Sequence, residues 1–68
     1  MEQFVDLYLL PYMTLKRPNR RHSVYAIKTI IERETKQYIS LENLQDYLAK
    51  CGYPVSDFYP VSERFFRR

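Results

Sequence analysis

The chain has 68 residues, a formal net charge of +3, one cysteine and one histidine, and this length suits a single small domain over residues 1–68. Cys51 alone excludes an intrachain disulfide, and no pair of cysteines or histidines has metal-site spacing, so we expect no metal and no cofactor. No apolar run approaches the roughly 18 residues of a transmembrane helix, and the acidic start lacks the basic region of a secretory signal, so we expect a cytoplasmic protein that binds no membrane.

The first predicted element is a short helix over Glu2 to Leu10. Phe4, Leu7 and Tyr8 recur there at helical spacing, with Val5 beside them, and predict the face that packs on the rest of the chain. Pro11 marks the expected end, because a residue before proline avoids the α region. A helix of about two turns is marginal alone, so we expect it to pack on the rest of the chain.

The second predicted helix runs from Val24 to Thr35, after a loop from Tyr12 to Asn19. Ser23 is its expected N-cap, because a serine hydroxyl can accept a backbone N–H of the first turn. Apolar residues then repeat every three or four positions and predict one buried face. These residues are Val24, Ile27, Ile30 and Ile31.

The third predicted helix runs from Leu41 to Cys51, with Ser40 as its N-cap. Gly52 stands directly after it, where a left-handed residue commonly ends a helix. Between the second and third helices, Tyr38-Ile39 has room for a short extended piece. The apolar face of the third helix is formed by Leu41, Leu44, Tyr47 and Leu48.

The C-terminal part is predicted to be irregular and then helical. Pro54 and Pro60 bracket a segment that suits extended or turn-rich backbone, and Ser62 to Arg68 can make a last short helix. The fold class expected from these elements is mainly all-α, as a small domain of three to four helices.

Charge is segregated along the chain. Residues 14–36 carry +5 and the last five residues carry +3, whereas residues 1–13 carry −2 and residues 37–63 carry −3. Basic residues directly ahead of a helix start favour a phosphate ligand, because the helix dipole and free N–H groups add to their charge. The alternative is that they are solvated loop charges. The expected nucleic-acid contacts are Lys16, Arg17, Arg20, Arg21, His22, Lys28, Arg64, Arg67 and Arg68.

Aromatic rings alternate with arginines near the C-terminus. This mixture can stack on bases of a single strand, and it can equally anchor a protein interface. A structural alternative is that Phe58 and Tyr59 complete a small core while Phe65 and Phe66 fray at the end. The expected partner-binding residues are Tyr53, Phe58, Tyr59, Phe65 and Phe66.

Two further functions are disfavoured by the residues themselves. The second and third helices could form a helix-turn-helix, but Glu42 and Asp46 on the third would repel phosphate. Catalysis is not expected, because His22 has no acidic residue near it in sequence and Ser23 is better placed as a cap. We therefore expect no enzyme, no catalytic residue and no small-molecule substrate.

The segment Arg21 to Lys28, with Glu32, Tyr38-Ile39-Ser40 and Gly52-Tyr53, resembles a group of short proteins encoded on phages and integrated mobile elements of Gram-positive bacteria. Their centre reads Ser-Ser-Tyr-x-Leu-Lys-His, then a Glu, then Tyr-x-Ser-Asn. The resemblance covers about half of the chain. Departures from the pattern include Val24 in place of a serine, Thr29 in place of a histidine and Leu41 in place of the asparagine.

The resemblance implies a genomic setting in which small basic proteins serve replication, excision or transcription control, or equip a polymerase for priming. Two hypotheses follow. The first is a non-enzymatic, nucleic-acid-associated accessory protein that binds the phosphate backbone through the basic cluster. The second is a protein-binding module, either a homodimer or a small partner or inhibitor of a larger enzyme such as a polymerase or helicase, that uses its aromatic surface.

Overall fold

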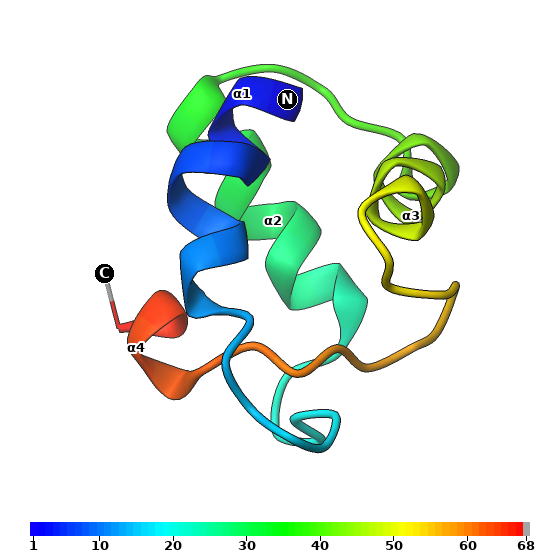
Figure 1. The fold of residues 1–68 in the computed structure, drawn as a ribbon. Helices are drawn as coiled ribbons and strands as arrows, with labels where there is room; N and C mark the ends of the chain where they lie inside the picture. The colour runs from blue at the N-terminus through cyan, green and yellow to red at the C-terminus, as the bar shows by residue number, and fades with distance from the viewer. Residues whose placement is uncertain (68) are drawn as a thin grey trace.

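The computed structural model describes residues 1–67, and every regular element in that range is helical. α2 crosses the centre, the N-terminal helical segment packs on one side of it, and α3 lies on the other (Figure 1). The prediction of a small, mainly all-α fold is confirmed. The elements are α1 (Glu2–Phe4), the π-helical turn η1 (Val5–Leu9), the 3-10 turn η2 (Leu10–Tyr12), α2 (Val24–Thr35), α3 (Leu41–Lys50) and α4 (Glu63–Phe66).

The N-terminal helical segment continues through Pro11 instead of ending before it. In an α-helix, the ring of this proline would clash with the carbonyl of Leu7, four residues earlier. The wider π turn and the tight 3-10 turn pass Pro11 without that geometry. The change of winding also shifts the buried face, so the prediction that Leu7 and Tyr8 are buried is wrong. Val5, which was expected beside that face, is buried, and so is Leu9.

α2 spans the residues predicted for it, and its four predicted apolar positions are all buried. Ser23 occupies the N-cap position with extended backbone, but its side chain accepts no capping hydrogen bond. The helix ends at Lys36, which has a left-handed backbone with φ of 57°.

α3 begins as predicted, because the Ser40 hydroxyl accepts the backbone N–H of Asn43 at 3.1 Å. Its end is closed by Gly52, whose φ of 99° favours a residue without a side chain. The N–H of Tyr53 then donates to the carbonyl of Leu48 at 2.9 Å, which completes a Schellman motif. Residues 38–40 form no strand within the described range, so the extended piece predicted there is absent as a regular element.

The C-terminal segment before α4 lies beside the loop between η2 and α2, and the two run antiparallel (Figure 1). The N–H of Leu15 donates to Pro60, and the N–H of Ser62 donates to Tyr12, at 3.2 and 2.7 Å. These bonds join residues more than 40 positions apart. They place the N-terminus of α4 next to the loop of residues 13–23, which we call the basic loop.

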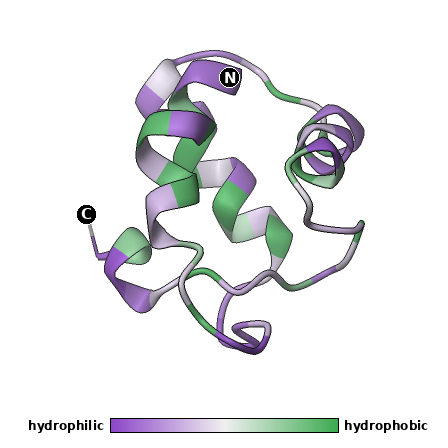
Figure 2. Ribbon diagram, viewed as in Figure 1, coloured by the Kyte–Doolittle hydropathy of each residue, from purple (hydrophilic) through white to green (hydrophobic). Residues whose placement is uncertain are grey.

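The core lies between the N-terminal helical segment, α2, α3 and the C-terminal segment. Figure 2 shows hydrophobic residues along α2 and on the neighbouring N-terminal turns. No helix within residues 1–67 is both long enough and apolar enough to cross a membrane. The buried apolar residues are Val5, Leu9, Met13, Val24, Ile27, Ile30, Ile31, Ile39, Leu44, Leu48, Tyr59, Val61 and Phe65.

Candidate nucleic-acid interface

Asn19 fixes the basic loop to the C-terminal segment. Its side chain is buried, and its Nδ2 donates to the carbonyl of Val61 at 2.9 Å and to Oε1 of Glu63 at 3.0 Å. Its Oδ1 accepts the backbone N–H of Arg21 at 3.0 Å, and its own N–H donates to the carbonyl of Tyr59 at 2.9 Å. One buried amide therefore holds both segments in a single arrangement, with its donors and acceptor all paired.

His22 and Glu63 form a second contact between the same segments. His22 Nε2 lies 3.0 Å from Glu63 Oε2, and the imidazole stacks on the Phe66 ring with centroids 3.8 Å apart. The hydrogen bond from Asn19, and then the one from His22, lower the pKa of the Glu63 carboxyl below its usual value. No acidic residue is near His22 in the sequence, but the fold brings Glu63 of α4 beside it.

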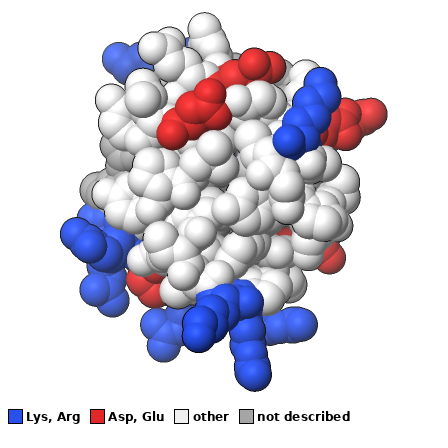
Figure 3. All heavy atoms as spheres, viewed as in Figure 1, with Lys and Arg blue, Asp and Glu red and all other residues white. Residues whose placement is uncertain are grey.

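The two basic segments meet at one end of the molecule. Figure 3 shows blue side chains over the loop between η2 and α2 and around α4, with a red side chain between the two groups and the other red side chains elsewhere on this face. Arg20 packs its guanidinium 5.7 Å from the centre of the Phe58 ring. We call this surface the basic end, and its described members are all exposed. They are Lys16, Arg17, Arg20, Arg21, Arg64 and Arg67.

One predicted nucleic-acid contact, Lys28, has its partners outside the basic end. Lys28 forms an ion pair with Glu32 at 3.0 Å and lies 5.3 Å from the centre of the Tyr38 ring. The N–H of Ile39, followed by Lys28, lowers the pKa of the Glu32 carboxyl. The structure thus gives Lys28 internal partners in place of an open phosphate contact. Arg68 lies outside the described residues.

The start of α2 is less open to an anion than its position in the sequence suggests. The backbone N–H of Val24 donates to the carbonyl of Asp57 at 2.8 Å. One of the N–H groups expected to face phosphate is therefore already used. The exposed side of α3 carries Glu42 and Asp46, which keeps that helix a poor surface for a polyanion.

The predicted aromatic contacts divide into core and surface. Tyr59 is 2% exposed and Phe65 is fully buried, so the fold places these two predicted partner-binding rings in the core. Both rings belong to the C-terminal segment that closes the core beneath α2, where they fill the space between the helices. Phe66 does not fray, because it stacks on His22. Tyr53, Phe58 and Phe66 keep part of their surface exposed.

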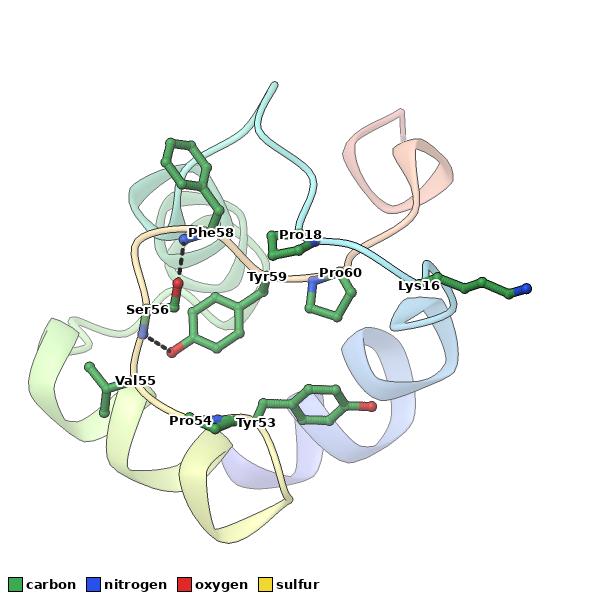
Figure 4. A pocket seen from close by; sticks show the side chains of 9 residues that line it. All are labelled: Lys16, Pro18, Tyr53, Pro54, Val55, Ser56, Phe58, Tyr59 and Pro60. Atoms are coloured by element: carbon green, nitrogen blue, oxygen red, sulfur yellow. Dashed lines mark hydrogen bonds between the residues drawn. The ribbon is translucent and has the colours of Figure 1, made fainter.

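A groove of about 280 Å³ opens beside the basic loop (Figure 4). Tyr53 lies on one side of it, Pro18 and Pro60 lie on the other, and the Tyr59 ring lies between them (Figure 4). The Phe58 ring points away from the groove, and the Lys16 side chain extends outward from its edge (Figure 4). The remaining lining residues are Pro54, Val55 and Ser56.

Sequence reasoning missed Asn19 and Glu63, which position the basic end. Each bonds to residues more than 40 positions away, and nothing local in the sequence marks such a pair. The one available signal was Glu63 in the first turn of a helix capped by Ser62, whose hydroxyl accepts the N–H of Arg64 at 3.3 Å. That signal predicts the helix but not the partner of the carboxylate.

Comparison with protein-family models, with curated proteins and with solved structures finds no match. Within residues 1–67, no three His, Cys, Asp or Glu side chains are grouped to hold a metal ion. The arrangement suits the binding of an extended anion along exposed guanidinium and ammonium groups that a buried polar contact holds together.

Proposed function

We propose that the protein is a non-enzymatic accessory of nucleic-acid transactions that binds the phosphate backbone through its basic end. The observation that carries this proposal is that the loop and α4 converge on one surface. Six exposed cations, contributed by segments more than 40 residues apart, lie at the same end of a molecule whose net charge is only +3. Cations that served only to keep the protein solvated could be spread over the whole surface.

Arginine predominates in this surface, with five of its six described cations. One guanidinium group can donate hydrogen bonds to two phosphate oxygens at once, and it stays charged at every physiological pH. Contacts of this kind give affinity without reading sequence. The expected setting is a mobile element, as the sequence resemblance implies, with a role in replication, priming or regulation.

The protein-binding alternative has less support from the geometry. Its predicted contact surface loses Tyr59 and Phe65 to the core, and Phe66 is occupied by His22. Tyr53 and Phe58 remain, and both lie near the basic loop. The remaining aromatic residues and the basic residues therefore lie on the same surface. The positive charge of this surface favours a polyanion over a protein partner.

The test is fluorescence anisotropy of labelled single- and double-stranded oligonucleotides at several salt concentrations. We expect binding that weakens steeply with salt and little dependence on sequence. Replacing Arg20 and Arg21 with alanine should weaken binding to every oligonucleotide. A matched variant, Arg33→Ala with Lys50→Ala, removes the same charge from α2 and α3 and should bind more tightly than the first.

Circular dichroism of each variant checks that the fold is retained. If the parent protein binds no oligonucleotide at low salt, the proposal is wrong. If both double variants lose the same affinity, only the total charge matters and the basic end has no special role.

A further inference from the structure

The groove beside the basic loop is an apolar surface set among cations. Its walls are rings, with Tyr53 facing the side formed by Pro18 and Pro60 (Figure 4). Lys16 stands at its edge, and Arg17 follows Lys16 directly in the loop. An occupant of this groove is therefore flat or apolar and is joined to negative charge.

We propose that the groove holds one unstacked base of a single-stranded nucleic acid, while the neighbouring phosphates contact Lys16 and Arg17. This inference rests on the proposed function and specifies its ligand. A base and its phosphates supply a flat ring and adjacent negative charges in one unit, and single-strand binders join aromatic stacking to a basic path in this way.

The size and shape of the groove support a single base. Its volume of about 280 Å³ lies below the ~300–1,000 Å³ of pockets for drug-sized ligands. Tyr53 is half-buried against the core, so its ring is held in place before any ligand arrives. In a duplex the bases are stacked and paired, and a base must leave the stack to enter such a site.

The cations lie on the loop side of the groove. Lys16 extends outward from one edge, and the loop continues from there to Arg17 and Arg20. Arg20 is held beside Phe58, which lies on the same C-terminal segment as the groove. A strand whose base enters the groove therefore has cations within reach on the loop side.

The experiment compares two fluorescently labelled 12-mers of equal charge, one of thymidine nucleotides and one made entirely of abasic sites. Phosphate contacts treat these two probes alike, and only the first offers rings. We expect the parent protein to bind the thymidine 12-mer about tenfold more tightly, as one stacked base contributes. The salt dependence of the two probes should be the same.

Variants locate the preference in the groove. Tyr53→Leu keeps an apolar side chain but removes the ring, and it should bring the affinity ratio between the two probes close to one. Tyr53→Phe should keep the ratio. Tyr38→Leu, which removes an exposed tyrosine outside the groove, should keep it as well.

A second measurement does not depend on the folding of any variant. A thymidine 12-mer that contains one 2-aminopurine should lose emission on binding the parent protein, because stacking on the Tyr53 ring quenches this base. Equal affinity of the parent for the thymidine and abasic probes overturns the inference while the proposed function stands. Binding of neither probe overturns both. An unchanged ratio in folded Tyr53→Leu also overturns the inference and leaves the groove to a protein segment.

Discussion

At the residue scale, the basic end depends on one buried side chain. Asn19 bonds to the backbone of the C-terminal segment, to the Glu63 carboxylate and to the backbone of the loop that contains it. A buried amide of this kind is stabilising only while all its partners remain. Since its partners come from both basic segments, the loss of this side chain affects the surface as well as the stability.

We predict that Asn19→Ala lowers the free energy of unfolding by about 1–3 kcal/mol, because buried partners lose their hydrogen bonds. The measurement is urea unfolding followed by circular dichroism. Asn43→Ala is the matched control, since Asn43 is exposed on α3 and should change stability little. Equal effects of the two substitutions would mean that Asn19 does not join the segments.

The contact of Glu63 with Asn19 and His22 makes the stability of the fold depend on pH. The pKa of this carboxyl is lower in the folded protein than its usual 4.5, so the unfolded chain binds the proton more readily. The stabilisation by the Glu63 carboxylate is therefore complete above pH 4.5, and it is lost as the pH falls through the lowered pKa of the folded protein. Glu32 shifts in the same direction.

We therefore predict that the unfolding midpoint of the parent falls as pH decreases below 4.5, and that Glu63→Gln falls less steeply. Glutamine keeps the shape of the side chain and has no proton to gain. Thermal unfolding at several pH values measures this difference. Parallel profiles for the two proteins would contradict this prediction, because the fold would then not stabilise the ionised carboxylate of Glu63.

At the element scale, the two main helices begin in different ways. Ser40 caps α3 through its side chain, whereas Ser23 occupies the same position before α2 and accepts no such bond. The start of α2 is held by the carbonyl of Asp57 instead. A serine in the N-cap position is therefore not enough to show that its hydroxyl caps the helix.

We predict that Ser40→Ala costs about 1 kcal/mol of stability and that Ser23→Ala costs clearly less. Both changes remove one hydroxyl from the same helix position, so each is the control of the other. Urea unfolding gives the two values. A larger loss for Ser23→Ala would contradict the hydrogen bonding described here.

The elements that the sequence predicted correctly are those with local causes. The register of α2 follows from apolar spacing, and the ends of α3 follow from Ser40 and Gly52. The face of the N-terminal segment was predicted wrongly because Pro11 changes the winding before it, which a fixed helical period does not include.

The candidate site was predictable in composition but not in arrangement. Loop and C-terminal arginines were recognised from charge alone, and nothing local indicated that Asn19 would bring them together. Tyr59 and Phe65 were among the expected partner contacts because aromatic rings alternate with arginines there, with a core role for Tyr59 as the alternative, and both rings are buried. The crossing of the C-terminal segment beneath α2 decides which rings are buried, and that crossing depends on contacts far apart in sequence.

At the scale of the whole molecule, charge is sorted by position. The chain alternates acidic and basic stretches, and the fold brings the cations of residues 16–21 to the same end as Arg64 and Arg67 (Figure 3). Such an arrangement concentrates positive potential where a polyanion would bind and steers association. The fold therefore gives a chain of modest net charge a locally strong basic surface.

The central claim is that the loop and α4 act as one phosphate-binding surface. The most direct test is the slope of binding affinity against salt concentration for four proteins: the parent, Arg20→Ala with Arg21→Ala, Arg64→Ala with Arg67→Ala, and all four substitutions together. We predict that each pair reduces the slope by roughly one unit per lost contact and that the two reductions add. An unchanged slope in the Arg64 and Arg67 variant, with the fold retained, would contradict the claim, because α4 would then lie outside the surface that binds phosphate.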